Sequence, residues 1–198
     1  IKMLKGAMQQ LIVGNPAILK TDIGPVIDDE AKQTIDQHIQ KMKSKGYPVH
    51  QLMFGATSQT ELDKGTFVVP TAIELPNLDD LQREVFGPVL HIITYKYGEL
   101  EQLISRINAK GYGLTMGLHT RIDETIQTVI QHAEVGNLYI NRNIVGAVVG
   151  VQPFGGEGLS GTGPKAGGPL YMYRLMQHCS NKVLATPFAV KNEQTIFE

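Results

Sequence analysis

Apolar runs and helical stripes alternate through residues 89–141, and this alternation restricts the fold more than any other feature of the sequence. The run Val89–Tyr95 is almost continuously apolar, which is typical of a strand buried on both faces of a parallel sheet. Strands that alternate with helices at short spacing predict an α/β fold, with a mostly parallel sheet flanked by helices. Beyond this run, the periodicity predicts a helix at 99–109, a strand at 114–120, a helix capped by Asp123 and stopped by Gly136, and a strand at 137–141.

The first ninety residues show the same two kinds of periodicity. Asp28 or Asp29 is suited to cap a helix that continues to about Lys45, where Gly46 supplies the stop. His38 lies on this helix, and we expect it at the surface or boundary rather than in a ligand set. The other predicted elements are a helix at 2–12, strands at 49–54 and 66–73 (the second an edge or irregular strand because of Pro70), and a short helical turn at 78–85.

Composition excludes several classes of protein. The 198 residues carry 18 basic and 19 acidic side chains, so charge favours neither a nucleic acid nor an anionic membrane as partner. No apolar run approaches the roughly 18 residues that span a bilayer. Cys179 is the single cysteine, so no internal disulfide forms, which favours a reducing cytoplasm; the residues around Cys179 are those of an incidental thiol.

The start of the sequence is a separate indication. Because a helical pattern begins at Ile1, we expect the chain to be part of a larger protein.

Glycine is concentrated in residues 150–168, directly after the last predicted strand. Ligands of open α/β sheets bind where such strands end, so this segment is the candidate wall of a binding site. Its G-x-G-x-x-G pattern at 156–161 is followed by prolines and glycines rather than a helix, which argues against a dinucleotide fingerprint. Lys165 lacks the following Ser or Thr of a phosphate-binding loop. Ser160 lacks a nucleophile elbow, and the six histidines form no metal-ligand pattern.

Two further features remain open from the residues alone. Glu84 precedes the apolar run and suits either a general base or, as we favour, a solvated carboxylate. Residues 170–190 lack helical periodicity, which indicates an extended segment paired with another part of the protein or with a partner subunit. We therefore divide the chain into a partial catalytic domain at 1–169, an oligomerisation-type segment at 170–190 and a polar tail at 191–198.

Five segments, in this order along the chain, together resemble the aldehyde dehydrogenase superfamily. The version of the glycine-rich segment found here is most similar to that of the pyrroline-5-carboxylate dehydrogenase module of bacterial proline utilization A proteins. The segments are 13–16 (VGNP) with 21–27 (TDIGPVI), 83–89 (REVFGPV), 112–114 (YGL), 136–141 (GNLYIN) and 153–156 (PFGG) with 160–161 (SG).

The resemblance implies roles for five residues. Glu84 would hydrogen-bond the nicotinamide ribose of NAD, and Phe86 would pack near the nicotinamide. Phe154 would form an apolar wall beside the aldehyde. The backbone amides of Gly146 and Ala147 would hold the α-carboxylate of L-glutamate γ-semialdehyde, a task that suits small residues. The family's nucleophilic cysteine, general-base glutamate and dinucleotide-binding domain have no counterpart here, so no catalytic residue is assigned.

The implied activity is therefore that of part of an NAD-dependent enzyme that oxidises glutamate semialdehyde to glutamate in proline catabolism. We expect the isolated chain to be inactive, because without a thiolate no hydride is transferred. The resemblance further implies a cytoplasmic bacterial homo-oligomer, with FAD in an upstream proline dehydrogenase domain. Two alternatives are a dehydrogenase for another aldehyde, and a non-catalytic assembly module that uses residues 170–188.

Overall fold

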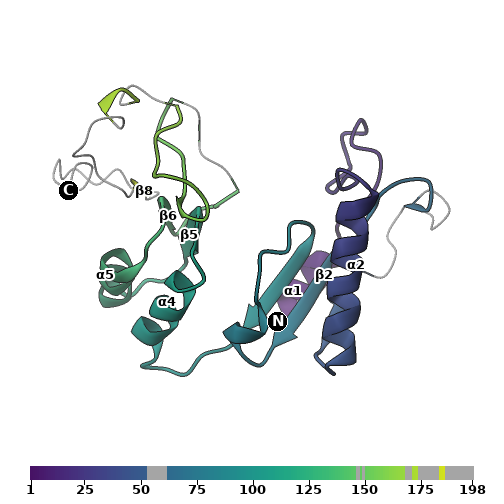
Figure 1. Cartoon of the computed structure of the whole chain (residues 1–198), viewed down its shortest axis with the longest axis horizontal. Helices are drawn as coiled ribbons and strands as arrows, with labels where there is room; N and C mark the ends of the chain where they lie inside the picture. Colours follow the sequence, from purple (N-terminus) through teal and green to yellow (C-terminus); the bar gives the residue numbers. More distant parts are fainter. Residues whose placement is uncertain (53–61, 146–147, 149, 168–170, 174–182, 186–198) are drawn as a thin grey trace. The chain divides into compact units, whose positions relative to one another are not determined.

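The computed structural model describes residues 1–52, 62–145, 148, 150–167, 171–173 and 183–185. The chain divides into two compact units, Ile1–Thr94 and Tyr95–Glu198, each of which is described by itself (Figure 1). Both units combine helices with short sheets, and the predicted α/β fold class is confirmed.

The first unit combines one long helix with a three-stranded sheet. Its elements are α1 (Lys2–Met8), α2 (Asp29–Ser44), β1 (Val49–Gln51), β2 (Thr71–Leu75), the 3-10 turn η1 (Leu78–Asp80) and β3 (Val89–Ile93). The strand order is β1-β2-β3, with β2 antiparallel to β1 and parallel to β3. The central strand is therefore β2, and the other elements are arranged around it.

Helix α2 begins and packs as its sequence predicts. The carboxylate of Asp28 accepts a hydrogen bond from the Ala31 amide at 2.7 Å, so Asp28 rather than Asp29 is the cap. Gly46, at φ 77°, follows the end of the helix and takes a backbone conformation that favours glycine. The apolar stripe packs on the sheet, and each buried side chain of this kind contributes roughly 1.5–3 kcal/mol. The cluster contains Ile35, Ile39, Met42, Val68, Ile73 and Leu75.

Helix α1 is attached to the opposite face of β2. Side chains alternate along a strand, so Glu74 faces away from Ile73 and Leu75. Its carboxylate contacts His50 Nε2 at 2.7 Å and Lys5 Nζ at 3.5 Å. The hydrogen bond from His50, more than the contact with Lys5, lowers the pKa of Glu74. The contact of Lys5 with Glu74 thus holds α1 to the face of the sheet that α2 does not cover, and the contact of His50 links β1 to β2 on that face.

Burial in the first unit differs from expectation, because β2 rather than β3 is the strand buried on both faces. Ala72 and Ile73 are fully buried, whereas Leu90 of β3 is 46% exposed. The reason is pairing, since β3 has a strand on only one side in the described sheet. Of the two alternatives predicted from Pro70, the edge position is wrong because β2 is the central strand, whereas the irregularity is confirmed because the strand begins only at Thr71. Pro70 lies just before β2, and its carbonyl accepts a hydrogen bond from the Leu52 amide at 3.0 Å.

The second unit contains two helices, a parallel sheet and a small antiparallel ladder. Its elements are α4 (Leu100–Asn108), β4 (Tyr112–Gly113), β5 (Thr115–Leu118), α5 (Asp123–His132), β6 (Asn137–Ile140), β7 (Glu157–Gly158) and β8 (Val183–Ala185). In the order β5-β6-β8, both neighbours run parallel to β6, while β4 pairs antiparallel with β7. All four residues of β6 are buried, and the two helices cover its apolar side. The core comprises Ile104, Val129, Ala133, Val135, Leu138 and Ile140.

The predicted helices and strands of this unit are confirmed, but two details are not. The alternation predicted one sheet through residues 89–141, whereas β3 pairs with β2 and β5 pairs with β6 in a separate sheet. The alternation of apolar runs and helical stripes predicts the type of each element, but it does not predict which strands pair. In addition, Asp123 is the first residue of α5 and not its cap. Ile122 occupies the cap position, and its amide donates to Thr120 Oγ1 at 3.2 Å.

The structure describes only part of the predicted extended segment at 170–190. Within it, Val183–Ala185 forms β8 beside β6, with Leu184 opposite Leu138. Cys179 and the tail at 191–198 lie outside the described residues, as do Met53 and Phe54 of the predicted strand at 49–54. Among the described residues, no helix combines the length and the hydropathy that a membrane span requires.

Candidate functional site

The glycine-rich segment folds back on itself beside β6. Phe154 and Ala166 form an antiparallel bridge in which each amide donates to the other carbonyl at 2.9 Å. Between them, the Gly163 amide donates to the Gly156 carbonyl at 2.7 Å. Residues 162–167 contain no helix, so the described part of the segment does not continue as a dinucleotide fingerprint.

Its glycines allow backbone segments to approach one another closely. Gly158 has φ 61°, and a Cβ there would lie 2.5 Å from the Gly111 carbonyl oxygen. A Cβ on Gly156 would lie 2.6 Å from the Ser160 carbonyl oxygen. The Gly113 amide donates to Ser160 Oγ at 3.1 Å, so Ser160 has a structural contact rather than a nucleophile's geometry. The glycines at these positions therefore allow the backbone to pack closely. This packing accounts for them without a bound phosphate.

Side chains of β6 hold the start of this segment. Asn137 Nδ2 donates to the Pro153 carbonyl at 2.9 Å, and the Gly155 amide donates to Asn137 Oδ1 at 3.2 Å. Gln152 Nε2 donates to the Tyr139 hydroxyl at 2.8 Å. Phe154, the predicted aldehyde wall, lies between these contacts and is half-buried. Sequence reasoning selected Phe154 by resemblance but missed the side chains that hold it.

Glu157 is an acid of the same segment with one buried carboxylate oxygen, which the sequence did not predict. Its Oε1 atom is buried and has no hydrogen-bond partner among the described residues. Burial raises the pKa of Glu157, and the positive charge of Lys165 partly opposes that shift. The Lys165 amine itself donates to the Thr162 carbonyl at 2.7 Å and to the Thr162 hydroxyl. Lys165 therefore closes the turn at 162–165, while Glu157 is left without a hydrogen bond at its buried oxygen.

The predicted cofactor residues lie in the first unit, on the segment that leads into β3. Glu84 is exposed, and Phe86 is 86% exposed. Gly87 follows, packed so closely on Ile35 that a Cβ would collide with the Ile35 side chain. The structure thus places Glu84 and Phe86 together on one exposed segment and Phe154 in the second unit. Gly146 and Ala147 lie outside the described residues.

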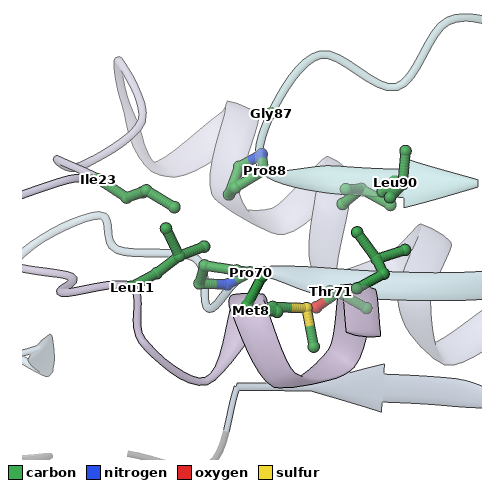
Figure 2. A pocket seen from close by; sticks show the side chains of 11 residues that line it. Met8, Leu11, Ile23, Pro70, Thr71, Gly87, Pro88 and Leu90 are labelled. Atoms are coloured by element: carbon green, nitrogen blue, oxygen red, sulfur yellow. The ribbon is translucent and has the colours of Figure 1, made fainter. Parts of the chain in front are cut away.

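An apolar cavity of about 390 Å³ lies beside this segment in the first unit. Figure 2 shows Met8 and Leu11 on one side of it and Pro88 and Leu90 on the other. Ile23, Pro70 and Thr71 also line it. Apart from the Thr71 hydroxyl, these side chains present no hydrogen-bonding group, so the cavity suits apolar contact rather than chemistry.

Two histidines form a second titratable group that sequence spacing did not reveal. His38 Nε2 and His91 Nε2 lie 2.8 Å apart, joining α2 to β3, and the rings meet edge to face. Burial, and then repulsion from His38, lowers the pKa of His91 to about 4. Burial also lowers the pKa of His38, with Arg83, Lys41 and Lys45 adding to the shift. Both rings are therefore neutral at neutral pH, as one donor and one acceptor.

The described residues contain no group of three or more His, Cys, Asp or Glu side chains arranged to hold a metal. The first unit offers instead an exposed acidic and aromatic pair at 84 and 86. The second unit offers an aromatic residue at 154 whose flanking peptide groups are held by hydrogen bonds. The first suits a hydroxyl-bearing ring system, and the second suits an apolar chain.

Comparison with known proteins places these features in context. The model of the aldehyde dehydrogenase family matches residues 1–180. The bifunctional protein PutA of Escherichia coli (strain K12) is 61% identical over 190 residues, which cover 96% of this chain and 14% of that protein. The 1-pyrroline-5-carboxylate dehydrogenase of Geobacillus sp. (strain WCH70) is 39% identical over 171 residues, covering 85% of this chain and 32% of the relative.

Solved structures give the same result. A crystal structure of a mutant PutA from Bradyrhizobium japonicum superimposes with a TM-score of 0.77 at 49% identity, covering 87% of this chain and 17% of that one. This chain therefore spans about one seventh of the length of the PutA protein of Escherichia coli.

Proposed function

Because this chain belongs to the aldehyde dehydrogenase family, we propose that it forms part of an enzyme that oxidises L-glutamate γ-semialdehyde to L-glutamate in proline catabolism. The observation that carries the proposal is the 61% identity to a PutA protein across 96% of the chain. The relatives named 1-pyrroline-5-carboxylate dehydrogenase support the same substrate, since pyrroline-5-carboxylate is the cyclic form of this semialdehyde.

NAD is the proposed cofactor, and the described residues fit it. Phe86 exposes nearly its whole side chain, which suits contact with the nicotinamide ring, and the exposed Glu84 carboxylate suits hydrogen bonds from ribose hydroxyls. When bound, NAD supplies the acceptor for hydride from the substrate. The remaining cofactor contacts are proposed to come from residues of the enzyme beyond these.

For the substrate, we propose that Phe154 forms the apolar wall and that the Gly146 and Ala147 amides hold the α-carboxylate. The segment between Arg142 and Lys165 carries no Lys or Arg, so an anion bound there needs backbone N–H groups. The nucleophilic thiolate is proposed to come from another part of the enzyme, because Cys179 is the single cysteine and lies outside the family's motif. We therefore expect no turnover by the 198-residue chain alone, and NADH formation above background would contradict this.

The carboxylate contact is testable in the intact dehydrogenase that carries this chain. Ala147→Pro removes one amide donor, so the KM for glutamate semialdehyde should rise at least about tenfold, while that for an aliphatic aldehyde changes little. Ala147→Gly keeps the amide and serves as the matched control. Equal changes for both aldehydes would contradict the anchoring role and leave a dehydrogenase for another aldehyde as the better assignment.

We also propose a cytoplasmic homo-oligomer that uses residues 170–188, in keeping with the single cysteine. The support is β8, which is an edge strand of its described sheet and so suits pairing with a second chain. Light scattering after size-exclusion chromatography tests this, and a strictly monomeric chain would count against an assembly module.

A further inference from the structure

We infer that Asn137, together with the Tyr139–Gln152 pair, positions Phe154 for its contact with the aldehyde. This inference rests on the proposed function, which assigns Phe154 to the substrate wall. Asn137 and Tyr139 would act through Phe154 and not by touching the substrate, so they are positioning residues.

The first argument is the geometry around Asn137. Its carboxamide donates to the carbonyl before Phe154, from Pro153, and accepts from the amide after it, from Gly155. One side chain therefore holds both peptide groups that flank the phenylalanine. Asn137 is fully buried, so losing it leaves a buried carbonyl and a part-buried amide without these partners.

The second argument is a further hydrogen bond between the same strand and the same segment, from Gln152 to Tyr139. Residues 137 and 139 are two apart in β6, so their side chains lie on one face. The Tyr139 hydroxyl accepts from Gln152, and both side chains are buried. The Arg142 guanidinium lies 5.0 Å from the centre of the Tyr139 ring, which adds a cation–π contact. Residues 152–155 are thus tied to β6 at both ends.

The third argument concerns Phe154 itself. Its amide and carbonyl both bond to Ala166, and its carbonyl also accepts from the Lys165 amide at 3.2 Å. With its flanking peptide groups held by β6, the backbone at 154 has little freedom, while its side chain remains partly exposed. Asparagine is also depleted in strands, so a fully buried one at the start of β6 requires a specific partner. The arrangement fixes the backbone position from which the aromatic side chain projects.

Asn108 provides a matched control in the same unit. Its carboxamide donates to the His132 carbonyl at 2.7 Å and accepts from the Glu134 amide at 3.1 Å. Asn108→Ala therefore removes the same two types of hydrogen bond as Asn137→Ala, but none to residues 152–155. Asn108 is half-buried whereas Asn137 is fully buried, so the control matches the two hydrogen bonds and not the burial. A change confined to residues 152–156 in Asn137→Ala therefore reports on the segment that carries Phe154.

The first experiment measures hydrogen exchange in the 198-residue chain by mass spectrometry. Asn137→Ala should speed exchange at 154–156 by about tenfold or more, whereas Asn108→Ala should leave that segment unchanged. Should Asn137→Ala fail to fold, Tyr139→Phe removes a single hydroxyl and should speed exchange at 152–154 by a smaller factor. Unchanged protection in the variant that folds overturns the positioning inference, whatever the enzyme does.

The second experiment measures kinetics in the intact dehydrogenase. Asn137→Ala should raise the KM for glutamate semialdehyde about tenfold while kcat falls less than about threefold, because a misplaced wall weakens ground-state binding. The Kd for NAD and the kinetics of Asn108→Ala should stay unchanged. Faster exchange without a KM change overturns the inference when Phe154→Ala does raise KM. If Phe154→Ala leaves KM unchanged, the failure belongs to the proposed role of Phe154.

Discussion

Phe86 and Phe154, which we propose to belong to one active site, are held in opposite ways. Phe86 lies on an exposed segment of the first unit, with 86% of its side chain exposed. Phe154 lies in the second unit, where hydrogen bonds to β6 and Ala166 hold the backbone around it. The difference teaches that contacts within the second unit fix the backbone around Phe154 before any ligand binds, whereas the Phe86 side chain has few contacts within the first unit.

The largest expected effect on stability comes from replacing a glycine beside the segment of each phenylalanine, Gly136 for Phe154 and Gly87 for Phe86. A Cβ on Gly136 would overlap the Gly155 carbonyl oxygen, and backbone on both sides leaves no room to adjust. Gly136→Ala should therefore cost about 3 kcal/mol or more of the free energy of unfolding. Gly87→Ala should cost only about 1–2 kcal/mol, because the obstacle is the end of the Ile35 side chain.

Urea unfolding followed by circular dichroism measures both variants. Gly6→Ala is the control, since a Cβ there meets nothing within 4 Å and alanine favours α1. An equal loss of unfolding free energy for Gly136→Ala and Gly87→Ala would contradict the expectation that backbone obstructs the first substitution and a side chain the second.

The His38–His91 pair predicts a pH dependence confined to the first unit. The pKa of His91 falls from its ordinary 6.5 to about 4 on folding, so the unfolded chain binds a proton more readily between these values. The contribution of His91 to the free energy of unfolding is therefore fully present above pH 6.5 and is lost as pH falls toward 4. His91→Gln should make the unfolding midpoint less sensitive to pH in this window. Parallel curves for the variant and the original chain would contradict the assignment.

Smaller effects on stability are expected from the aspartates at the starts of two helices, Asp28 at α2 and Asp123 at α5. Asp28→Ala removes the bond to the Ala31 amide and should destabilise the first unit by about 1 kcal/mol. Asp123→Ala removes no cap bond, so it loses only the favourable charge near the α5 start, about 0.3–1 kcal/mol at low salt. Thermal unfolding at low and high salt separates them, because only the Asp123 effect should fade strongly with salt.

The smallest effect on stability is expected at Phe86. Phe86→Ala should change the free energy of unfolding by less than about 0.5 kcal/mol, since the side chain is mostly exposed. In the intact enzyme the same variant should weaken NAD binding, as measured by the Kd. Phe154→Ala should lower the free energy of unfolding by more than Phe86→Ala does. A larger loss for Phe86→Ala would contradict the use of side-chain exposure to compare the two segments.

Periodicity predicted the element types well because burial on one face leaves a direct trace in sequence. The stripe of Ile35, Ile39 and Met42 led to α2, and the caps at Asp28 and Gly46 marked its ends. Pairing was harder to predict. The run at 89–95 looked more buried than it is, because burial depends on which neighbour strand is present and not on the run alone.

The residues alone pointed to the glycine-rich segment at 150–168 as the wall of a binding site and left the role of Glu84 open. The proposed roles of Glu84, Phe86 and Phe154 come from the family. The Asn137 and His38–His91 contacts were missed because each joins residues 16 to 53 apart in sequence. Hydrogen bonds at such separations follow from the tertiary fold, so neither propensity nor local spacing reveals them.

The pairing of β8 with β6 has a consequence for the order of folding. Strands β5 and β6 are joined through α5 by a short connection, whereas residues 141–182 separate β6 from β8. Closing the longer loop costs more chain entropy and raises the contact order. We therefore expect the β5–α5–β6 portion to form early and β8 to dock last. The segment that carries Phe154 lies inside that loop, but its hydrogen bonds are to Asn137 of β6 and to Ala166. The backbone around the aromatic wall should therefore become fixed before β8 docks.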